Sequence, residues 1–431
     1  MLQRRATRIG IALSVLVLFI ATGAIVYNLP IFQDAFGWRI SQLQARIKYA
    51  ISPPGEAVFT PNPTVAAMVQ ATLEAFTPTA THTATPGPTL TPTPSPTATI
   101  EPTPLPAIVQ LNGIRHEYQK WNNCGPANLS MALSFWGWDG TQRPIADFVK
   151  PNARDKNVMP YELASFVEEG TGLEGIVRGG GDLDMLKRFI AAGFPVMVEK
   201  GFEGPGFDGW MGHYEVVTGY DDTRQRVTVQ DSYIMPDLPV SYADLESYWR
   251  HFNYTFLVIF PPEREDEVMA LLGPLADETR SYEYAAELAS TEILQFTDRD
   301  LFFAWFNRGT NLMRLQDYGG AALAYDEAFK IDAAMAFNNP KHRPWRILWY
   351  QTGPYFAYYY TGRYYDVLNL ADFTIENMSE PAVEESFYWR GLAREALGDT
   401  DGAIDDFEKA LKWHPDWEPA LSQLRRLGVV S

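Results

Sequence analysis

The 431-residue sequence contains a single cysteine, Cys124, so the chain cannot form an intramolecular disulfide. Basic residues are also scarce, because 35 Lys and Arg stand against 53 Asp and Glu and give a formal net charge of −18. Since phosphate binding needs a basic face, this balance argues against nucleic acid as a partner. The six histidines and one cysteine show no zinc-site spacing, and no GxxxxGK[ST] phosphate loop is present. We therefore expect neither a metal nor a cofactor.

A long uncharged run, Ile9–Pro30, is about the length that crosses a bilayer, and Arg4, Arg5 and Arg8 precede it. Basic residues before a span favour a cytoplasmic N-terminus. We therefore predict that residues 1–30 form a cytoplasmic N-terminus and a transmembrane signal-anchor of a bacterial, single-pass cell-membrane protein, with its C-terminal domains extracytoplasmic. A signal peptide cleaved near Ala21-Thr22-Gly23 is the alternative.

Two segments separate this anchor from the rest of the chain. Residues 31–77 contain helical stripes of apolar side chains, which predict a juxtamembrane helical segment. Residues 78–106 are almost entirely Thr, Pro, Ala and Ser, a composition that cannot bury a core and favours extended polyproline II geometry. We expect residues 78–106 to be a linker that holds the next domain away from the membrane.

Residues 107–262 show the pattern of one compact α+β domain. Helices are indicated after Cys124, at 159–169 and at 183–192, and strands at 195–199, 214–219, 226–230 and 256–260. The last of these strands is apolar throughout, which predicts a central position in a sheet.

Cys124 is placed as a cysteine nucleophile would be. Leu129, Ala132, Leu133 and Trp136 recur at helical spacing after it, so Cys124 lies at a predicted helix N-terminus. The positive end of the helix dipole favours a thiolate over a thiol. Gln119, five residues upstream, can supply an amide donor to the same pocket. A small buried residue that packs the helix is the other interpretation of this cysteine.

An activated thiol needs a base, and residues 107–262 contain only His116, His213 and His251. His213 directly precedes the predicted strand 214–219, which would hold its ring in place. Asp231 ends the neighbouring strand, and a hairpin between the two strands would bring Asp231 to the imidazole. Asp231 can equally be an ordinary residue of a turn that ends a strand.

Residues 263–431 are helical and repetitive. From Gly309 and from Gly391, small or aromatic residues recur at the same offsets of 12, 16 and 19, and Pro415 lies 24 beyond Gly391. This pattern resembles the tetratricopeptide repeat (TPR), a helix–turn–helix unit whose stacked copies form an all-α solenoid. Such repeats typically bind protein partners, although a scaffold that only rigidifies its neighbour is also possible.

The segments 121–127, Trp-Asn-Asn-Cys-Gly-Pro-Ala, and 212–217, Gly-His-Tyr-Glu-Val-Val, together resemble the C39-like peptidases, a family with a papain-like fold. The resemblance implies that Cys124 is the nucleophile, His213 the general base and acid, and Asp231 its orienting partner. It also implies an oxyanion hole formed by the side-chain amide of Gln119 and the backbone N–H of Cys124. In the family the aspartate is commonly followed by proline, whereas Ser232 follows it here.

These expectations combine into a membrane-anchored, extracytoplasmic thiol hydrolase, a probable cysteine peptidase that acts on a peptide or protein substrate. The repeats would recruit the substrate or a protein partner. The same residues also suit a transglutaminase-like acyltransferase. A non-catalytic peptide-binding module on a papain-like scaffold is the alternative outside enzymes.

Overall fold

The computed structural model describes residues 38–54, 57–61, 104–150, 152, 154–204 and 209–430, with a few isolated positions before residue 72. The helices are α3 (Trp38–Ile51), α5 (Cys124–Phe135), α6 (Gln142–Val149), α7 (Pro160–Gly170), α8 (Leu183–Ala191), α9 (Tyr242–Trp249), α10 (Glu265–Leu272), α11 (Glu278–Ile293), α12 (Asp298–Arg314), α13 (Tyr318–Asn338), α14 (Gly353–Tyr360), α15 (Tyr364–Asn377), α16 (Glu384–Ala396), α17 (Thr400–Trp413) and α18 (Glu418–Arg426). The strands are β1 (Ile108–Gln110), β2 (Glu174–Arg178), β3 (Val196–Phe202), β4 (Met211–Asp221), β5 (Arg226–Gln230), β6 (Leu238–Ser241) and β7 (Phe256–Phe260).

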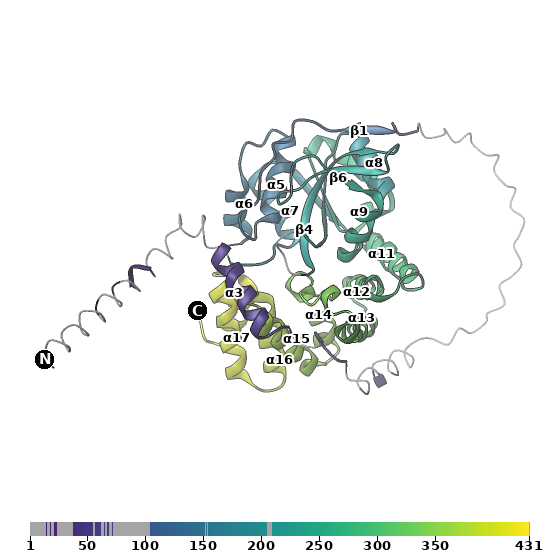
Figure 1. Cartoon of the computed structure of the whole chain (residues 1–431). Coiled ribbons are helices and arrows are strands. Elements are labelled where there is room, and N and C mark those ends of the chain that lie inside the picture. Colours follow the sequence, from purple (N-terminus) through teal and green to yellow (C-terminus); the bar gives the residue numbers. More distant parts are fainter. Residues whose placement is uncertain are drawn as a thin grey trace, which may run out of the picture.

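The strands form one antiparallel sheet in the order β2-β7-β3-β4-β5-β6 (Figure 1). Strand β1 pairs with the C-terminal end of β4, where Gln110 lies opposite Gly219. All four predicted strands are present, and β7 is central and buried along its whole length. The predicted hairpin is also present, because β4 and β5 pair directly, with Val216 opposite Gln230. The three predicted helices of this domain correspond to α5, α7 and α8.

Alternate residues of β3 and β4 enter two separate cores. Met197, Tyr214 and Val216 pack with α5, α6 and α7 on one face of the sheet. Val198 and Val217 pack with α8, α9 and α10 on the other. A sheet covered on both faces needs strands that are apolar on both sides, and this explains why β3 and β7 are hydrophobic along most of their length.

The helical region from α11 onward is built from helix hairpins, and the two predicted glycines show why the repeat has its spacing. A Cβ atom on Gly309 would lie 2.8 Å from the ring of Tyr325, and one on Gly391 would lie 2.8 Å from the ring of Phe407. In each hairpin the second helix therefore inserts an aromatic ring where the first has no side chain. Gly362 and Gly398 both adopt positive φ in the turn between helices, a conformation that glycine reaches without steric cost.

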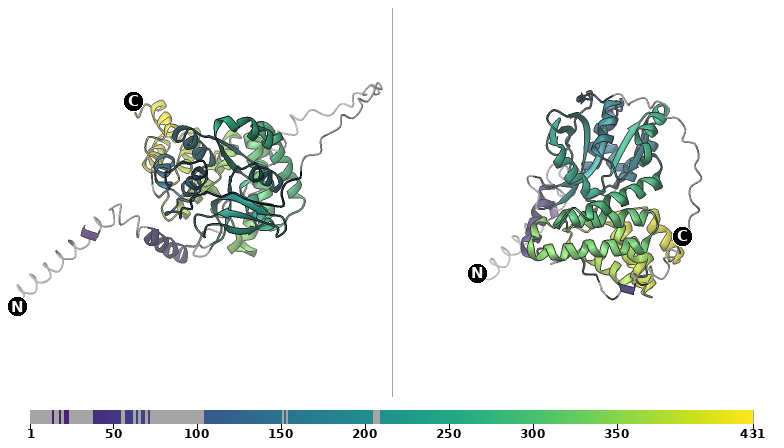
Figure 2. Two further views of the ribbon diagram at one scale, coloured as in Figure 1. Left: turned by 90° about the horizontal axis from the view of Figure 1, so that it is seen from above. Right: turned by 90° about the vertical axis from the view of Figure 1, so that its right-hand side faces the viewer.

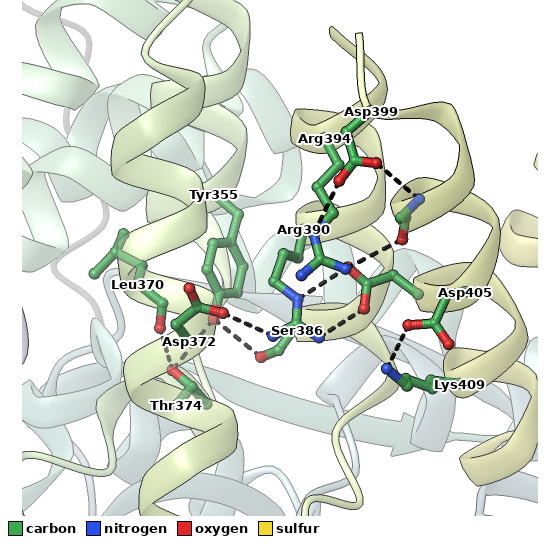
Figure 3. Close-up of polar contacts among 12 residues, drawn as sticks. Tyr355, Leu370, Asp372, Thr374, Ser386, Arg390, Arg394, Asp399, Asp405 and Lys409 are labelled. Carbon is green, nitrogen blue, oxygen red and sulfur yellow. Dashed lines mark hydrogen bonds and ion pairs between the residues drawn. The ribbon is translucent and has the colours of Figure 1, made fainter. Parts of the chain in front are cut away.

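Ion pairs made by buried arginines join helices of this region, and Figure 3 shows those of Arg390. The guanidinium of Arg390, on α16, donates to Asp406 on α17 at 2.6 Å and to Asp372 on α15 at 2.7 Å. Arg363 makes a similar pair of hydrogen bonds to Asp326 on α13, at 2.8 and 2.9 Å. Because a buried charge left without its partner is costly, these pairs fix the relative position of neighbouring hairpins.

The sheet region and the helical region pack directly on each other (Figure 2), and one hydrophobic core crosses the boundary. Trp210, which precedes β4, stacks on Phe252 at 5.7 Å and packs against Phe303 of α12 at 5.5 Å. Asn253 and Asn311 exchange two buried side-chain hydrogen bonds of 2.8 and 2.9 Å across the same boundary. The start of β4 is therefore held by the helical region.

The predicted transmembrane run, Ile9–Pro30, lies almost wholly outside the described residues. Within the described part of the chain, no helix is both long and apolar enough to cross a membrane. The anchor therefore stays a prediction. The helix expected within 31–77 is present as α3, but Leu43 and Ile47 of its apolar stripe are exposed.

Candidate active site

The turn before Cys124 is held by the side chain of Gln142, which lies 19 to 25 residues further along the chain than the residues it contacts. Gln142, the first residue of α6, is 2 % exposed, and its Oε1 accepts from the backbone N–H of Lys120 at 2.7 Å and from Asn123 Nδ2 at 3.1 Å. Its Nε2 donates to Glu117 Oε1 and to the carbonyl of Tyr118, both at 2.9 Å. The carboxamide of Gln142 thus fixes residues 117–123 through four hydrogen bonds.

Cys124 is the first residue of α5, as the sequence predicts, and it is partly exposed. Asn123 precedes the helix, and its side chain makes no capping hydrogen bond. The first backbone N–H groups of a helix have no partner within it; in α5 these are the N–H groups of Cys124 and Gly125, because Pro126 has none and that of Ala127 donates to the carbonyl of Asn123 at 2.9 Å. A thiolate or an oxyanion at Cys124 would lie at the positive end of the helix dipole.

His213 lies near the start of β4 and is hydrogen bonded to Asp231, with 3.2 Å between His213 Nε2 and Asp231 Oδ1. Both side chains are buried, at 4 % and 1 % exposure. Because Nε2 faces the aspartate, Nδ1 is the ring nitrogen left for the thiol. The ring of Phe202 lies beside the imidazole, 4.7 Å between centroids.

The charges around the imidazole favour its protonated form. Burial alone would lower the pKa of His213, but Asp231 and then a hydrogen bond with Cys124 outweigh it and raise the pKa to about 10. Burial also opposes ionisation of Asp231, yet the positive charge of His213 and the backbone N–H groups of Ile234 and Tyr233 hold the pKa of that carboxyl well below its usual range. The arrangement therefore stabilises the imidazolium form of His213.

Gln119 is oriented by the residue after the aspartate. The hydroxyl of Ser232 donates to Gln119 Oε1 at 2.9 Å and accepts from Asn128 Nδ2 at 2.8 Å. The backbone N–H of Gln119 also donates to the carbonyl of Ser232 at 2.8 Å. Since its oxygen is engaged, the Nε2 end of the Gln119 carboxamide points away from Ser232 and is free to act as a donor.

Asn128, one turn along α5 from Cys124, links this hydroxyl to the helix and the sheet. Its Nδ2 also lies 2.7 Å from the carbonyl of Tyr214 on β4 and 2.9 Å from the carbonyl of Cys124. The segments that carry Cys124, His213 and Gln119 therefore meet at one buried amide and one buried hydroxyl.

A second carboxylate, that of Glu215, lies close to the His213–Asp231 pair. Glu215 is 1 % exposed, and its Oε1 lies 2.7 Å from Lys200 Nζ. Burial raises the pKa of Glu215, whereas the Lys200 charge opposes that rise. Among the described residues, His213, Glu215 and Asp231 form the grouping whose ligand atoms, all within 4.8 Å of one another, could hold a metal ion. Lys200 pairs with Glu215 in this cluster.

Two more ionisable side chains belong to the surroundings of Cys124. Lys150 is 5 % exposed, and burial lowers its pKa to about 8, against an opposing contribution from Asp155 and then Cys124. Its Nζ donates to the carbonyl of Asn122 at 2.8 Å, so it also supports the turn before the helix. Glu199, on β3, is 6 % exposed, and burial raises its pKa well above the usual range.

The other two histidines have different environments. His251 is completely buried, accepts from Trp210 Nε1 at 3.0 Å and stacks on Phe303, and burial lowers its pKa to about 4. His116 contacts Gln230 Oε1 at 3.3 Å. The structure thus brings together Cys124, His213, Asp231 and the Gln119 segment, whereas His251 packs in the core. The catalytic roles of the four residues stay predictions.

Sequence reasoning missed the residues that position these groups. Gln142, Asn128 and Ser232 are polar side chains within or beside apolar elements, and nothing in their local pattern distinguishes them from surface residues. The one available signal was Ser232, because it stands where the C39-like pattern commonly has proline.

Comparison with known families agrees with this architecture. The profile of the Peptidase_C39 like family matches residues 103–256, and that of the tetratricopeptide repeat matches residues 384–417. A solved structure described as a C39-like peptidase from Bacillus anthracis aligns at 16 % identity and a TM-score of 0.30, covering 35 % of this chain and 96 % of that one. A comparison with curated proteins found no match.

The chain therefore contains a C39-like peptidase-family domain, a mixed α/β unit around an antiparallel sheet. A helical region that includes a tetratricopeptide repeat follows it.

Proposed function

We propose that the protein is a thiol hydrolase, a cysteine peptidase that cleaves a peptide or protein substrate outside the cytoplasm while anchored in the cell membrane. The observation that carries the proposal is the buried hydrogen bond between His213 and Asp231 beside the single cysteine, which begins a helix. The match of residues 103–256 to the Peptidase_C39 like family supports the same reaction class.

In the proposed reaction the Cys124 thiolate attacks the scissile carbonyl, and the Gln119 side-chain amide and the Cys124 backbone N–H stabilise the oxyanion. The His213 imidazolium gives its proton to the departing amine, and a thioester forms. His213 then takes a proton from water, whose attack releases the acid and restores the thiol pair. Asp231 keeps the imidazole in the orientation that presents Nδ1 to the thiol.

The helical region would recruit the substrate or a partner protein, as tetratricopeptide repeats typically do. It also has a mechanical role in this proposal, because the core around Trp210 holds the start of β4 three residues before His213. A Cβ on Gly212 would meet the ring of Tyr350 at 2.8 Å, so the helical region contacts the strand next to the proposed base.

A peptide library tests the reaction. The full chain, in detergent, is incubated with a mixed peptide pool, and new termini are identified by mass spectrometry with Cys124→Ala as control. New termini that disappear in the variant are expected. Incorporation of a fluorescent primary amine into the peptides, in place of cleavage, would instead support a transglutaminase-like acyltransferase. Peptide retention without either product would support the binding module.

A further inference from the structure

The helical region carries a peptide-docking surface, and part of the N-terminal segment already lies on it. Val58 and Phe59 are 3 % and 5 % exposed and belong to the same hydrophobic core as α12, α13 and α14. They precede the Thr- and Pro-rich linker in the sequence, whereas the helices that bury them follow the peptidase-family domain.

Residues 57–61 lie outside regular secondary structure, with a bend at Val58, and they contact the helical region as a docked segment does. The ring of Phe59 packs edge-on against Phe329 of α13 at 5.6 Å between centroids, and it packs at a tilt of 47° against Tyr358 of α14 at 5.5 Å. The backbone N–H of Val58 donates to Asp332 Oδ2 at 2.9 Å. Buried aromatic anchors and a satisfied main-chain donor are the features by which a folded domain recognises a short segment.

The side chain that accepts from Val58 is itself well anchored. Asp332 is completely buried and is paired with Arg343, whose guanidinium donates to it at 3.1 and 3.0 Å. We define the docking surface as Phe329, Asp332, Arg343 and Tyr358.

Helix α3, just before this segment, attaches to the same body at a second place. The ring of Tyr49 packs edge-on against Trp345 at 5.3 Å. The ammonium group of Lys48 donates to the backbone carbonyls of Glu376 and Met378, where α15 ends. Figure 1 shows α3 lying across the helical region. Two separate contacts therefore hold residues 48–59.

We propose that residues 57–61 are the resident ligand of the docking surface, and that this contact ties the catalytic body directly to the predicted membrane anchor. Only seven residues, 31–37, separate the end of the predicted span from α3, so the body would lie within about 30 Å of the anchor. A fully extended linker of residues 78–106 would instead allow about 90 Å. The segments before and after the linker, residues 57–61 and the peptidase-family domain, both belong to the same folded body. The linker therefore forms a loop on that body and does not set the distance between the body and the membrane. A protein partner for this surface must displace residues 57–61.

Cutting the linker tests this proposal independently of any catalytic activity. A site for a sequence-specific protease is inserted within residues 90–95 of the full chain, which is purified in detergent, cut and run on gel filtration. We expect the N-terminal piece to co-elute with the piece that contains residues 107–431. Separation of the two pieces would overturn the proposal.

Two variants make the test specific to residues 57–61. Val58→Ala combined with Phe59→Ala should release the N-terminal piece at least about tenfold faster on dilution, because both buried anchors are lost. Ile51→Ala is the matched control, since Ile51 is on the same piece but 80 % exposed, and it should release at the wild-type rate. All of these substitutions lie in the N-terminal piece, so the sequence of the larger piece is unchanged. Circular dichroism checks that the larger piece stays folded. Equal release rates for the double variant and the wild type would contradict the docking role.

Discussion

Ser232 provides the sharpest test of how the site is assembled, because it contacts the proposed oxyanion donor and not the thiol. Its hydroxyl donates to Gln119 Oε1 at 2.9 Å and accepts from Asn128 Nδ2 at 2.8 Å. Replacing Ser232 with alanine removes the hydrogen bond that fixes the Gln119 carboxamide. Asn128 keeps the carbonyls of Tyr214 and Cys124 as partners, so no buried donor is left unpaired.

The size of the effect follows from that single hydrogen bond. A neutral hydrogen bond contributes about 0.5–1.5 kcal/mol net, so Ser232→Ala should slow a step that needs the oxyanion hole by about two- to thirteenfold. Removing the donor itself with Gln119→Ala should cost more, about 100- to 1,000-fold. Asp231 keeps its hydrogen bonds from the backbone N–H groups of Tyr233 and Ile234 in both variants.

Two reagents separate this effect from general damage to the site. Acylation of Cys124 by p-nitrophenyl acetate passes through an oxyanion, and the burst of p-nitrophenolate measures its rate. Alkylation by iodoacetamide is a direct displacement at carbon and forms no oxyanion. We expect Ser232→Ala to slow acylation and leave alkylation unchanged. Ser281→Ala, which removes a buried hydroxyl of the helical region, should change neither rate. Equal losses in both reactions of Ser232→Ala, or no loss in either, would refute the reasoning.

Two further predictions concern stability. The pKa of His213 is about 10 in the folded protein, above its value of about 6.5 in an unfolded chain. His213 therefore contributes fully to the free energy of unfolding below about pH 6.5, and this contribution is lost as the pH rises to about 10. Urea unfolding across this range should therefore show a downward slope that is smaller in His213→Ala, and identical slopes would count against the buried ion pair. Gly391→Ala should lower the free energy of unfolding by about 1–3 kcal/mol, because the new Cβ would meet the Phe407 ring at 2.8 Å. Gly175→Ala, where the nearest atoms lie at 3.5 Å, is its control, and equal midpoints in chemical denaturation would show that the close approach is not needed.

Local pattern explains which parts of the fold could be predicted from the sequence. The helix after Cys124 was visible because its apolar residues recur at helical spacing, and α5 begins at that cysteine. The β4–β5 hairpin was predictable because two apolar runs are joined by a short polar turn, and its geometry brings Asp231 to His213. The glycine-to-aromatic spacing of the repeats likewise reports a contact between adjacent helices.

Contacts between residues distant in the sequence explain most of what was missed. Gln142 holds the turn before Cys124 across 19 to 25 residues, and Ser232 reaches Gln119 across 113. Such pairs leave no periodic signal in a single sequence. Strand β2 was missed because it is a short edge strand that contains Gly175 and ends in Arg178. The docking of Phe59 against Tyr358 was unpredictable for the same reason, since nearly 300 residues lie between them in the chain.

The most direct test of the central claim is the rate of alkylation of Cys124 by iodoacetamide between pH 4 and pH 9. Because the chain has one cysteine, all label on the full-length protein reports this thiol. If His213 and Cys124 form a thiolate–imidazolium pair, Cys124 should react rapidly well below pH 8, and His213→Ala should shift the reaction to the pH range of an ordinary thiol. A wild-type profile that rises only near the pKa of a free cysteine, about 8.5, and is unchanged in His213→Ala would contradict the account.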